Sequence, residues 1–166
     1  MTGLDLDVTV VREYSRTDVT ISPDEDLDEL VRHVLLAEGS TGSWEVALVC
    51  VSDERLQRMH ADFMGIDEPT DVMTFEHEPE DGEPGRPVRG GDIVISVDRA
   101  AEQSEAGGND AAREVLFLVT HGVLHLTGWT DASPADRAAM LDRGEALLSA
   151  WERDRQTGAD LDRVSR

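Results

Sequence analysis

Hydrophobic residues recur along this chain at two spacings, which predict about four strands and four or five helices. Residues 4–12, LDLDVTVVR, alternate and then become β-branched, which is typical of a strand. Residues 27, 30, 31, 34 and 35 are apolar at helical spacing, so a helix is predicted from Pro23 to Gly39. The same criteria predict strands at 44–51, 71–77 and 92–97, and helices at about 54–65, 98–108, 111–127 and 134–155.

The order of these elements favours one α+β domain with an α/β-like first half and a helical second half. We predict a mixed four-stranded sheet with four to five surrounding helices, formed by residues 1–155. A length of 166 residues suits one such domain. Residues 156–166 are expected to form a frayed C-terminal tail. Residues 78–91 hold three prolines and four glycines among charged residues, which predicts a mobile surface loop.

The charge balance of the chain is strongly acidic. Asp and Glu number 36 against 15 basic residues, all of them arginine, and the net charge is −21. The hydrophobic content of 39% and the periodic segments argue against disorder. A lysine-free acidic surface is expected of a protein adapted to a salty, halophile-like cytoplasm, where the screening length is about 3 Å at 1 M salt. Because such salt weakens both repulsion from and attraction to nucleic acid, net charge neither supports nor excludes an RNA substrate.

Cysteine content and hydropathy bear on the cellular setting. Cys50 is the only cysteine and lies in the apolar run WEVALVCV, so we expect a small core residue in a reducing, cytoplasmic protein. The segment MTGLDLDVTVV lacks the basic start of a signal peptide. No apolar run approaches the roughly 20 residues that a membrane span needs. A membrane partner is therefore not expected.

The segment THGVLHLTGWTD, residues 120–131, carries the pattern H-x3-H-x2-G-x2-D. His121 and His125 would project from one face of a largely apolar helix, where buried imidazoles need partners. Gly128 suits the left-handed conformation that ends a helix, and the resulting turn would let Asp131 return toward the histidines. Two imidazoles and one carboxylate suit Zn²⁺ and leave its fourth position open for water. The metal would acidify that water or polarise a substrate oxygen.

Two simpler interpretations compete with a metal site of this kind. The histidines could donate to backbone carbonyls while Asp131 caps the last helix, although Ser133 is the better cap. The same spacing occurs in metzincin zinc proteases, where glutamate, the general base, follows the first histidine. Gly122 holds that position here, which disfavours peptide hydrolysis by that mechanism. We expect this glycine to let another element, or a substrate, approach the helix closely.

Three segments together resemble the bacterial rRNA maturation factors of the YbeY type, a family of metal-dependent single-strand endoribonucleases. They are residues 59–78 (MHADFMGIDEPTDVMTFEHE), residues 90–96 (GGDIVIS) with the helix containing AAEQ, and residues 120–131 with the downstream Met140 and Glu145. The resemblance covers about residues 45–150. It implies a mixed four-stranded sheet and one zinc ion per chain, held by His121, His125 and Asp131 at the mouth of a cleft. The Thr70-Asp71 turn and Gly91-Asp92 would lie near that cleft.

The same resemblance implies a function in ribosome biogenesis. The substrate would be single-stranded rRNA, the reaction hydrolysis of phosphodiester bonds, and the partner the small ribosomal subunit. Maturation of the 3′ end of 16S rRNA and a part in ribosome quality control are implied, and DNA is not an expected substrate. The sequence identifies no protein base, so the metal-bound water would be the nucleophile or general base. Two alternatives stay open: a zinc-dependent hydrolase of another substrate such as peptide, and an assembly factor with a structural metal.

Two residues depart from the family pattern. Most members have histidine where this chain has Asp131. A carboxylate ligand would make the bound metal a weaker Lewis acid, and it makes Mn²⁺ an alternative to Zn²⁺. Many members have arginine where Met64 stands, and methionine cannot hold a phosphate. Either another arginine replaces it, or the activity is weaker or differently supported. Each nearby arginine alone is also explained as a solvated partner of the acidic surface. The candidate substrate-binding residues are Arg58, Arg86, Arg89 and Asp71.

Overall fold

Strands and helices alternate along the chain as far as β3, β4 follows β3 directly in the element order, and the later elements are helices. The computed structural model describes residues 3–66, 70–78, 87–108 and 110–164. In chain order the elements are β1 (Leu4–Glu13), α1 (Asp24–Ala37), β2 (Gly42–Val51), α2 (Asp53–Met64), β3 (Val72–Glu76), β4 (Val88–Ser96), α3 (Val97–Gly107), α4 (Ala111–Leu126) and α5 (Pro134–Val164).

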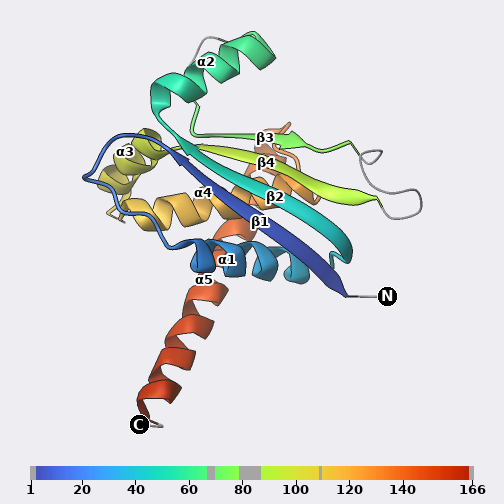
Figure 1. The fold of residues 1–166 in the computed structure, drawn as a ribbon, viewed down its shortest axis with the longest axis vertical. Coiled ribbons are helices and arrows are strands. Elements are labelled where there is room, and N and C mark those ends of the chain that lie inside the picture. Colours follow the sequence, from blue (N-terminus) through green and yellow to red (C-terminus); the bar gives the residue numbers. More distant parts are fainter. Residues whose placement is uncertain (1–2, 67–69, 79–86, 109, 165–166) are drawn as a thin grey trace.

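The strands of the described residues form one mixed sheet in the order β1-β2-β4-β3 (Figure 1). β1, β2 and β4 are parallel, whereas β3 runs antiparallel to β4 at one edge. Parallel neighbours need a crossover connection, and α1 supplies it between β1 and β2. The predicted fold class is confirmed: the described chain is one α+β domain with a mixed four-stranded sheet and five helices.

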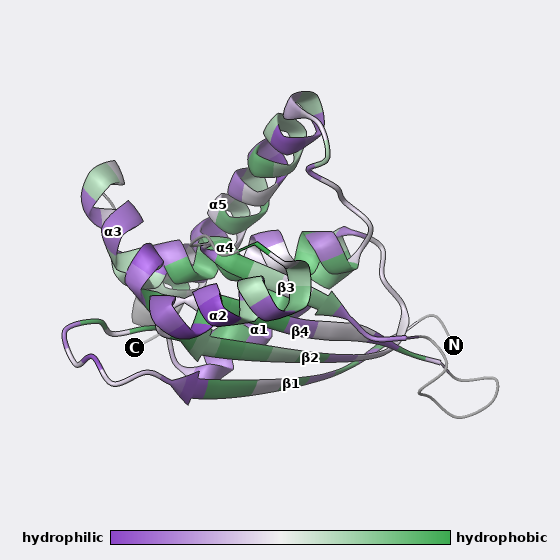
Figure 2. Cartoon of the chain, turned by 90° about the horizontal axis from the view of Figure 1, so that it is seen from above, coloured by the Kyte–Doolittle hydropathy of each residue, from purple (hydrophilic) through white to green (hydrophobic). Residues whose placement is uncertain are grey.

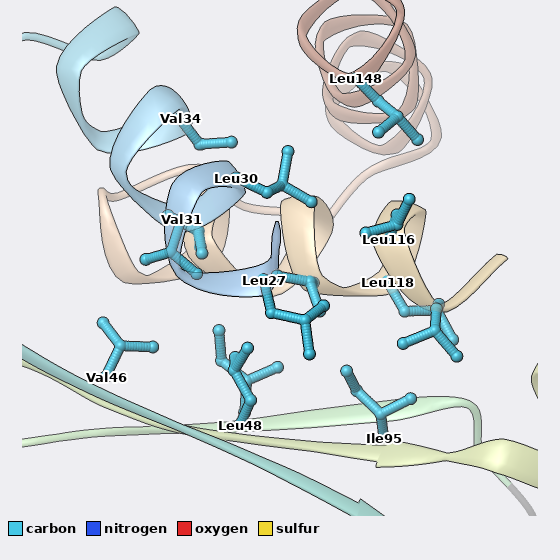
Figure 3. Packing of buried hydrophobic residues seen from close by; sticks show 14 of the residues in the cluster. Leu27, Leu30, Val31, Val34, Val46, Leu48, Ile95, Leu116, Leu118 and Leu148 are labelled. Carbon is cyan, nitrogen blue, oxygen red and sulfur yellow. The ribbon is translucent and has the colours of Figure 1, made fainter. Parts of the chain in front are cut away.

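The main hydrophobic core lies between the sheet and a layer that contains α1 and α4 (Figure 3). Leu27 and Leu30 of α1 are fully buried. Leu27 points toward Leu48 of β2 and Ile95 of β4, whereas Leu30 extends toward α4 (Figure 3). Burying each side chain of this size stabilises a fold by roughly 1.5–3 kcal/mol. α5 packs against both α1 and α4. This packing fixes the position of α4, which carries the two histidines.

The opposite face of the sheet is covered in part by α2. Leu56 of α2 is fully buried in a second cluster with Val51, Met73 and Val94. Hydrophobic stretches run through β1, β2 and β4 among hydrophilic residues (Figure 2), and acidic side chains such as Asp7 are exposed on β1. The two faces therefore differ, and the apolar helices gather on the face that holds the main core.

β4 begins at Val88, whereas the sequence pattern predicts residues 88–91 as part of a loop. The difference arises because two glycines in this segment allow close contact between neighbouring strands and do not form a turn. A Cβ on Gly90 would lie 1.9 Å from the backbone oxygen of Glu45, and a Cβ on Gly91 would lie 2.2 Å from that of Phe75. Glycine is required where neighbouring backbones approach so closely. Residues 79–86 of the predicted loop lie outside the described residues.

α5 continues to Val164, nine residues past the end predicted near residue 155. Arg155 pairs with Asp26 and Glu29 of α1 at 3.1 and 3.0 Å, and the neighbouring Trp151 is buried. Gly158 does not interrupt the helix, since one glycine in a helix costs only about 1 kcal/mol. Across the described ranges, none of the helices combines the length and the apolar character that crossing a membrane requires.

Candidate metal centre

α4 brings the two histidines of the sequence motif together. The helix begins after Asp110, whose carboxylate accepts a hydrogen bond from the backbone N–H of Arg113 at 2.7 Å. His121 and His125 lie one turn apart, with ring centroids separated by 4.8 Å and ring planes at 83°. The imidazoles therefore share one face of a helix whose other faces are mostly buried.

Gly122, between the histidines, lets α4 lie directly against β4. A Cβ at this position would lie 2.6 Å from Cγ2 of Ile93, closer than real Cβ contacts allow. Ile93 is fully buried, so it has little space into which to move. The close approach predicted for this glycine is thus present, and the approaching element is the strand.

The turn after α4 directs the chain back toward the histidines. Gly128 has a φ of +108°, and the backbone N–H of Trp129 donates to the carbonyl of Leu124 at 3.1 Å, which closes the helix end. The hydroxyl of Ser133 accepts the backbone N–H of Asp136 at 3.1 Å and so caps α5. Asp131 is not used as that cap, and its Oδ2 lies 3.7 Å from Nε2 of His125.

The same turn is fastened to the end of α1 by Glu38. Its carboxylate accepts hydrogen bonds from Nε1 of Trp129 at 3.1 Å and from Nε of Arg143 at 2.9 Å. The Glu38 side chain retains only 14% of its exposure, so both bonds are largely shielded from water. This contact joins α1, the turn and α5 beside Asp131.

His121, His125 and Asp131 form a cluster in which each offers a ligand atom within 4.8 Å of the others. Zinc bonds of about 2.0–2.1 Å place two ligand atoms at most about 4.2 Å apart. Nε2 of His125 and Oδ2 of Asp131, which lie 3.7 Å apart, already meet this limit. Among the described residues, no other group of three histidine, cysteine or acidic side chains is arranged in this way.

The state of His121 also fits a metal ligand. Burial lowers the pKa of His121, and His125 lowers it further, whereas Asp71 and Asp131 act in the opposite direction. The ring is therefore neutral near pH 7 and retains a lone pair. Its Nδ1 is buried and has no hydrogen-bond partner within the described ranges. The surrounding protein therefore leaves part of the hydrogen-bonding capacity of this ring unused, and a cation would bind to the same ring.

The cluster opens into a cavity of about 180 Å³ between α4, β3 and the start of α5. The cavity is lined by Thr70, Asp71, Val72, Thr74, Phe117, Leu118, His121, His125, Asp131, Arg137 and Leu141. The Thr70-Asp71 turn thus lies at the cleft, as expected. Gly91 and Asp92 do not line it: Asp92 instead lies 3.4 Å from Nε2 of His77.

Of the three arginines named from the sequence, Arg58 and Arg89 do not line the cavity. Arg58 is exposed on α2, and the guanidinium of Arg89 lies over the ring of Trp44, 4.7 Å from its centroid. Arg86 lies outside the described residues. Arg58 and Arg89 lie near Met64 in the sequence, whereas the described residues that line the cavity belong to α4, β3, α5 and the turns beside them. The arginine that does line it, Arg137, was missed, although it lies in the first turn of a predicted helix, close to Asp131.

Together the fold and the cavity define a class of protein: an α+β domain whose central helix and following turn present two imidazoles and a carboxylate to a recessed cleft. This arrangement is typical of hydrolases with a catalytic metal, because three protein ligands leave one position open.

Comparison with known proteins gives the family. The family described as endoribonuclease YbeY matches residues 12–152. An endoribonuclease YbeY from Halalkalibacterium halodurans is 40% identical over 132 residues, covering 75% of this chain and 81% of the relative. Another, from Roseiflexus castenholzii, is 35% identical over 150 residues, covering 87% and 91%. The solution structure of TM1509 from Thermotoga maritima shares the fold, with a TM-score of 0.57 and 20% identity over 92% of this chain and 93% of that one.

The chain belongs to the YbeY endoribonuclease family. The resemblance stated from the three sequence segments is confirmed, and so is the assignment to an enzyme family that hydrolyses phosphodiester bonds.

Proposed function

We propose that this chain is a metal-dependent endoribonuclease that cleaves single-stranded ribosomal RNA, with His121, His125 and Asp131 as its metal ligands. The observation that carries the proposal is the clustering of these three side chains at a recessed cavity in a member of this family. We further propose that it matures the 3′ end of 16S rRNA on the small ribosomal subunit, with a part in ribosome quality control. That role implies a cytoplasmic setting.

Different residues at the cavity are suited to bind the metal ion and the substrate. When bound, a divalent cation supplies Lewis acidity at the scissile phosphate and lowers the pKa of water. The neutral ring of His121 and the carboxylate of Asp131 are suited to hold it. Oδ2 of Asp71 accepts a hydrogen bond from Nε2 of Gln103 at 3.2 Å, which orients the carboxylate at the cavity wall. There it is suited to accept a ribose 2′-hydroxyl, a group that DNA lacks.

A single strand suits this cavity better than a duplex. His121 retains 8% of its exposure, so a scissile phosphate must enter the recess to reach the cluster. An unpaired strand bends and exposes its phosphate and sugar to such a recess, whereas a helical duplex is stiff. This geometry supports single-stranded RNA as the substrate class.

Zinc is the ion we propose, with one ion per chain. Two imidazoles and one carboxylate suit Zn²⁺, while the harder carboxylate keeps Mn²⁺ as the alternative. Elemental analysis of protein purified without added metal and without a histidine tag tests this directly. Replacing the carboxylate by a third imidazole, in Asp131→His, should raise the preference for Zn²⁺ over Mn²⁺. Manganese as the sole metal of the purified protein would reject zinc.

The activity is tested with four substrates: a labelled single-stranded RNA, its duplex, the DNA of the same sequence, and casein. We expect cleavage of the single-stranded RNA alone, its loss with chelator and its return with Zn²⁺. Because we also propose that the acidic surface is adapted to high salt, the assay is run at about 0.1 M and about 2 M NaCl. Cleavage of casein without cleavage of RNA would favour a peptide hydrolase and reject the proposal.

A structural metal in an assembly factor is the remaining alternative. Structural zinc sites are closed by four protein ligands, whereas this cluster offers three and opens into the cavity. Asp131→Ala separates the two roles by circular dichroism and RNA cleavage. A catalytic site predicts a folded protein without turnover, and a structural site predicts an unfolded one. Undiminished RNA cleavage by Asp131→Ala or His125→Ala would contradict the whole mechanism.

A further inference from the structure

The cavity contains one permanent positive charge among the described side chains that line it. Two carboxylates, Asp71 and Asp131, and the imidazoles of the cluster are its other ionisable groups. The remaining lining residues are apolar or carry hydroxyl groups. In a chain of net charge −21, the guanidinium of Arg137 is therefore the group at this site with which an anion can pair.

Arg137 makes no ion pair with any residue of the described ranges. Most other arginines there differ, because their guanidinium groups lie within 4.0 Å of a carboxylate. They are Arg12, Arg16, Arg55, Arg99, Arg113, Arg143 and Arg155. Although two carboxylates line the same cavity, neither pairs with Arg137.

The backbone places Arg137 close to the turn that carries Asp131, and its side chain lines the same cavity. The N–H of Arg137 donates to the carbonyl of Ser133 at 2.9 Å, which fixes the residue in the first turn of α5. That turn follows directly on the one that holds Asp131.

We propose that Arg137 is a substrate-binding residue that holds a phosphate of the RNA backbone beside the histidine cluster. The inference rests on the proposed endoribonuclease function and adds to it the residue that recognises the phosphate. A guanidinium offers a planar pair of N–H donors that matches two phosphate oxygens. Arg137 thus takes the place that sequence proximity had suggested for Arg58, Arg86 or Arg89.

The test compares Arg137→Gln and Arg137→Lys with Arg153→Gln. Arg153 is exposed on the same helix and does not line the cavity, so its variant removes the same charge elsewhere. Cleavage of single-stranded RNA by zinc-loaded protein gives KM and kcat. Fluorescence anisotropy with a single-stranded 2′-O-methyl oligonucleotide gives binding independent of turnover. Competition with a chelator gives the affinity for Zn²⁺.

Arg137→Gln should raise KM and the anisotropy dissociation constant about tenfold. This change is close to the lower limit for a charge-assisted hydrogen bond, because the residue is exposed. Arg137→Lys should fall between it and wild type, since lysine keeps the charge and loses the paired donors. The slope of log affinity against log salt should decrease by about 0.7 for Arg137→Gln, the value for one phosphate contact on a single strand. Arg153→Gln should leave these quantities unchanged.

The affinity for Zn²⁺ separates phosphate binding from a purely structural role. Removing a neighbouring positive charge should leave zinc binding unchanged or tighten it, whereas a residue that positions Asp131 would weaken zinc binding when lost. Weaker zinc binding, or RNA binding by Arg137→Gln equal to that of Arg153→Gln, overturns the inference while the proposed function stands. A wild-type protein that neither binds nor cleaves single-stranded RNA overturns the proposed function itself, and the inference with it.

Discussion

Gly122→Ala tests whether α4 must lie directly against β4. The added methyl would lie 2.6, 3.0 and 3.1 Å from three side-chain carbons of Ile93, which is itself fully buried. Overpacking of this kind costs about 1–3 kcal/mol, and three close contacts favour the upper end. Alanine regains about 1 kcal/mol of helix propensity over glycine. The expected net loss is therefore about 2 kcal/mol.

This loss corresponds to a melting temperature lower by about 4–8 °C for a domain of this size. Gly144→Ala is the matched control on α5, because its Cβ would lie 3.5 Å from Cε2 of Phe117, an ordinary contact. That variant should gain about 0.5–1 kcal/mol. Both variants are measured by thermal and urea denaturation, and zinc affinity is measured beside them, since Gly122 separates the two histidines.

A double-mutant cycle identifies the cause of the loss. Ile93→Ala alone should cost about 2–5 kcal/mol, because it leaves a cavity in the core. In that background the methyl of Gly122→Ala has room, so adding it should cost nothing or stabilise the protein. Two results would show that close packing on β4 is not the reason for the glycine. One is a melting temperature of Gly122→Ala equal to that of Gly144→Ala, and the other is an equal loss of stability from Gly122→Ala in the Ile93→Ala background.

Three further predictions concern the turn beside the site, an ion pair between α4 and α5, and the buried cysteine. Trp129→Phe removes the N–H bonded to Glu38; we expect a loss of about 1 kcal/mol and weaker zinc binding, and unchanged values of both would refute the bracing role. Arg113 lowers the pKa of Glu145, so this ion pair stabilises the protein above pH 4.5, the ordinary pKa of glutamate, and its contribution is lost as the pH falls through the lowered pKa. The difference in unfolding free energy between wild type and Glu145→Gln should therefore shrink from pH 6 to pH 3. Burial raises the pKa of Cys50 to about 11, so iodoacetamide should label it at pH 8 only after unfolding, and rapid native labelling would contradict its burial.

The parts of the site that depend on local spacing could be predicted from the sequence. His121 and His125 meet because residues four apart share a helix face, and Gly128 adopts a positive φ because the helix ends there. The same local reasoning gave the strands, the helices and the fold class. It placed Asp131 near the histidines because only five residues, including the glycine of the turn, lie between it and His125.

The parts that depend on long-range contacts could not be predicted in this way. Trp129 and Glu38 are hydrogen-bonded across 91 residues of sequence, and no periodic pattern marks such a pair. Gly90 was assigned to a loop because glycine marks both turns and close backbone approaches, and only the neighbouring strand distinguishes them. Arg137 was missed for a related reason: candidates were chosen by distance along the chain from Met64, whereas the cavity joins β3 to α5.

The charges at the cavity also suggest how so acidic a chain attracts an anionic substrate. The two carboxylates of Asp71 and Asp131 outnumber the one guanidinium of Arg137 among the described residues that line the cavity. A divalent cation reverses this balance, so metal loading should convert a repulsive recess into an attractive one. RNA affinity should therefore rise on adding Zn²⁺, and more at low salt than at high salt, because salt screens charge. Equal affinity with and without the ion, measured with the 2′-O-methyl oligonucleotide at low salt, would mean that RNA is held elsewhere on the surface.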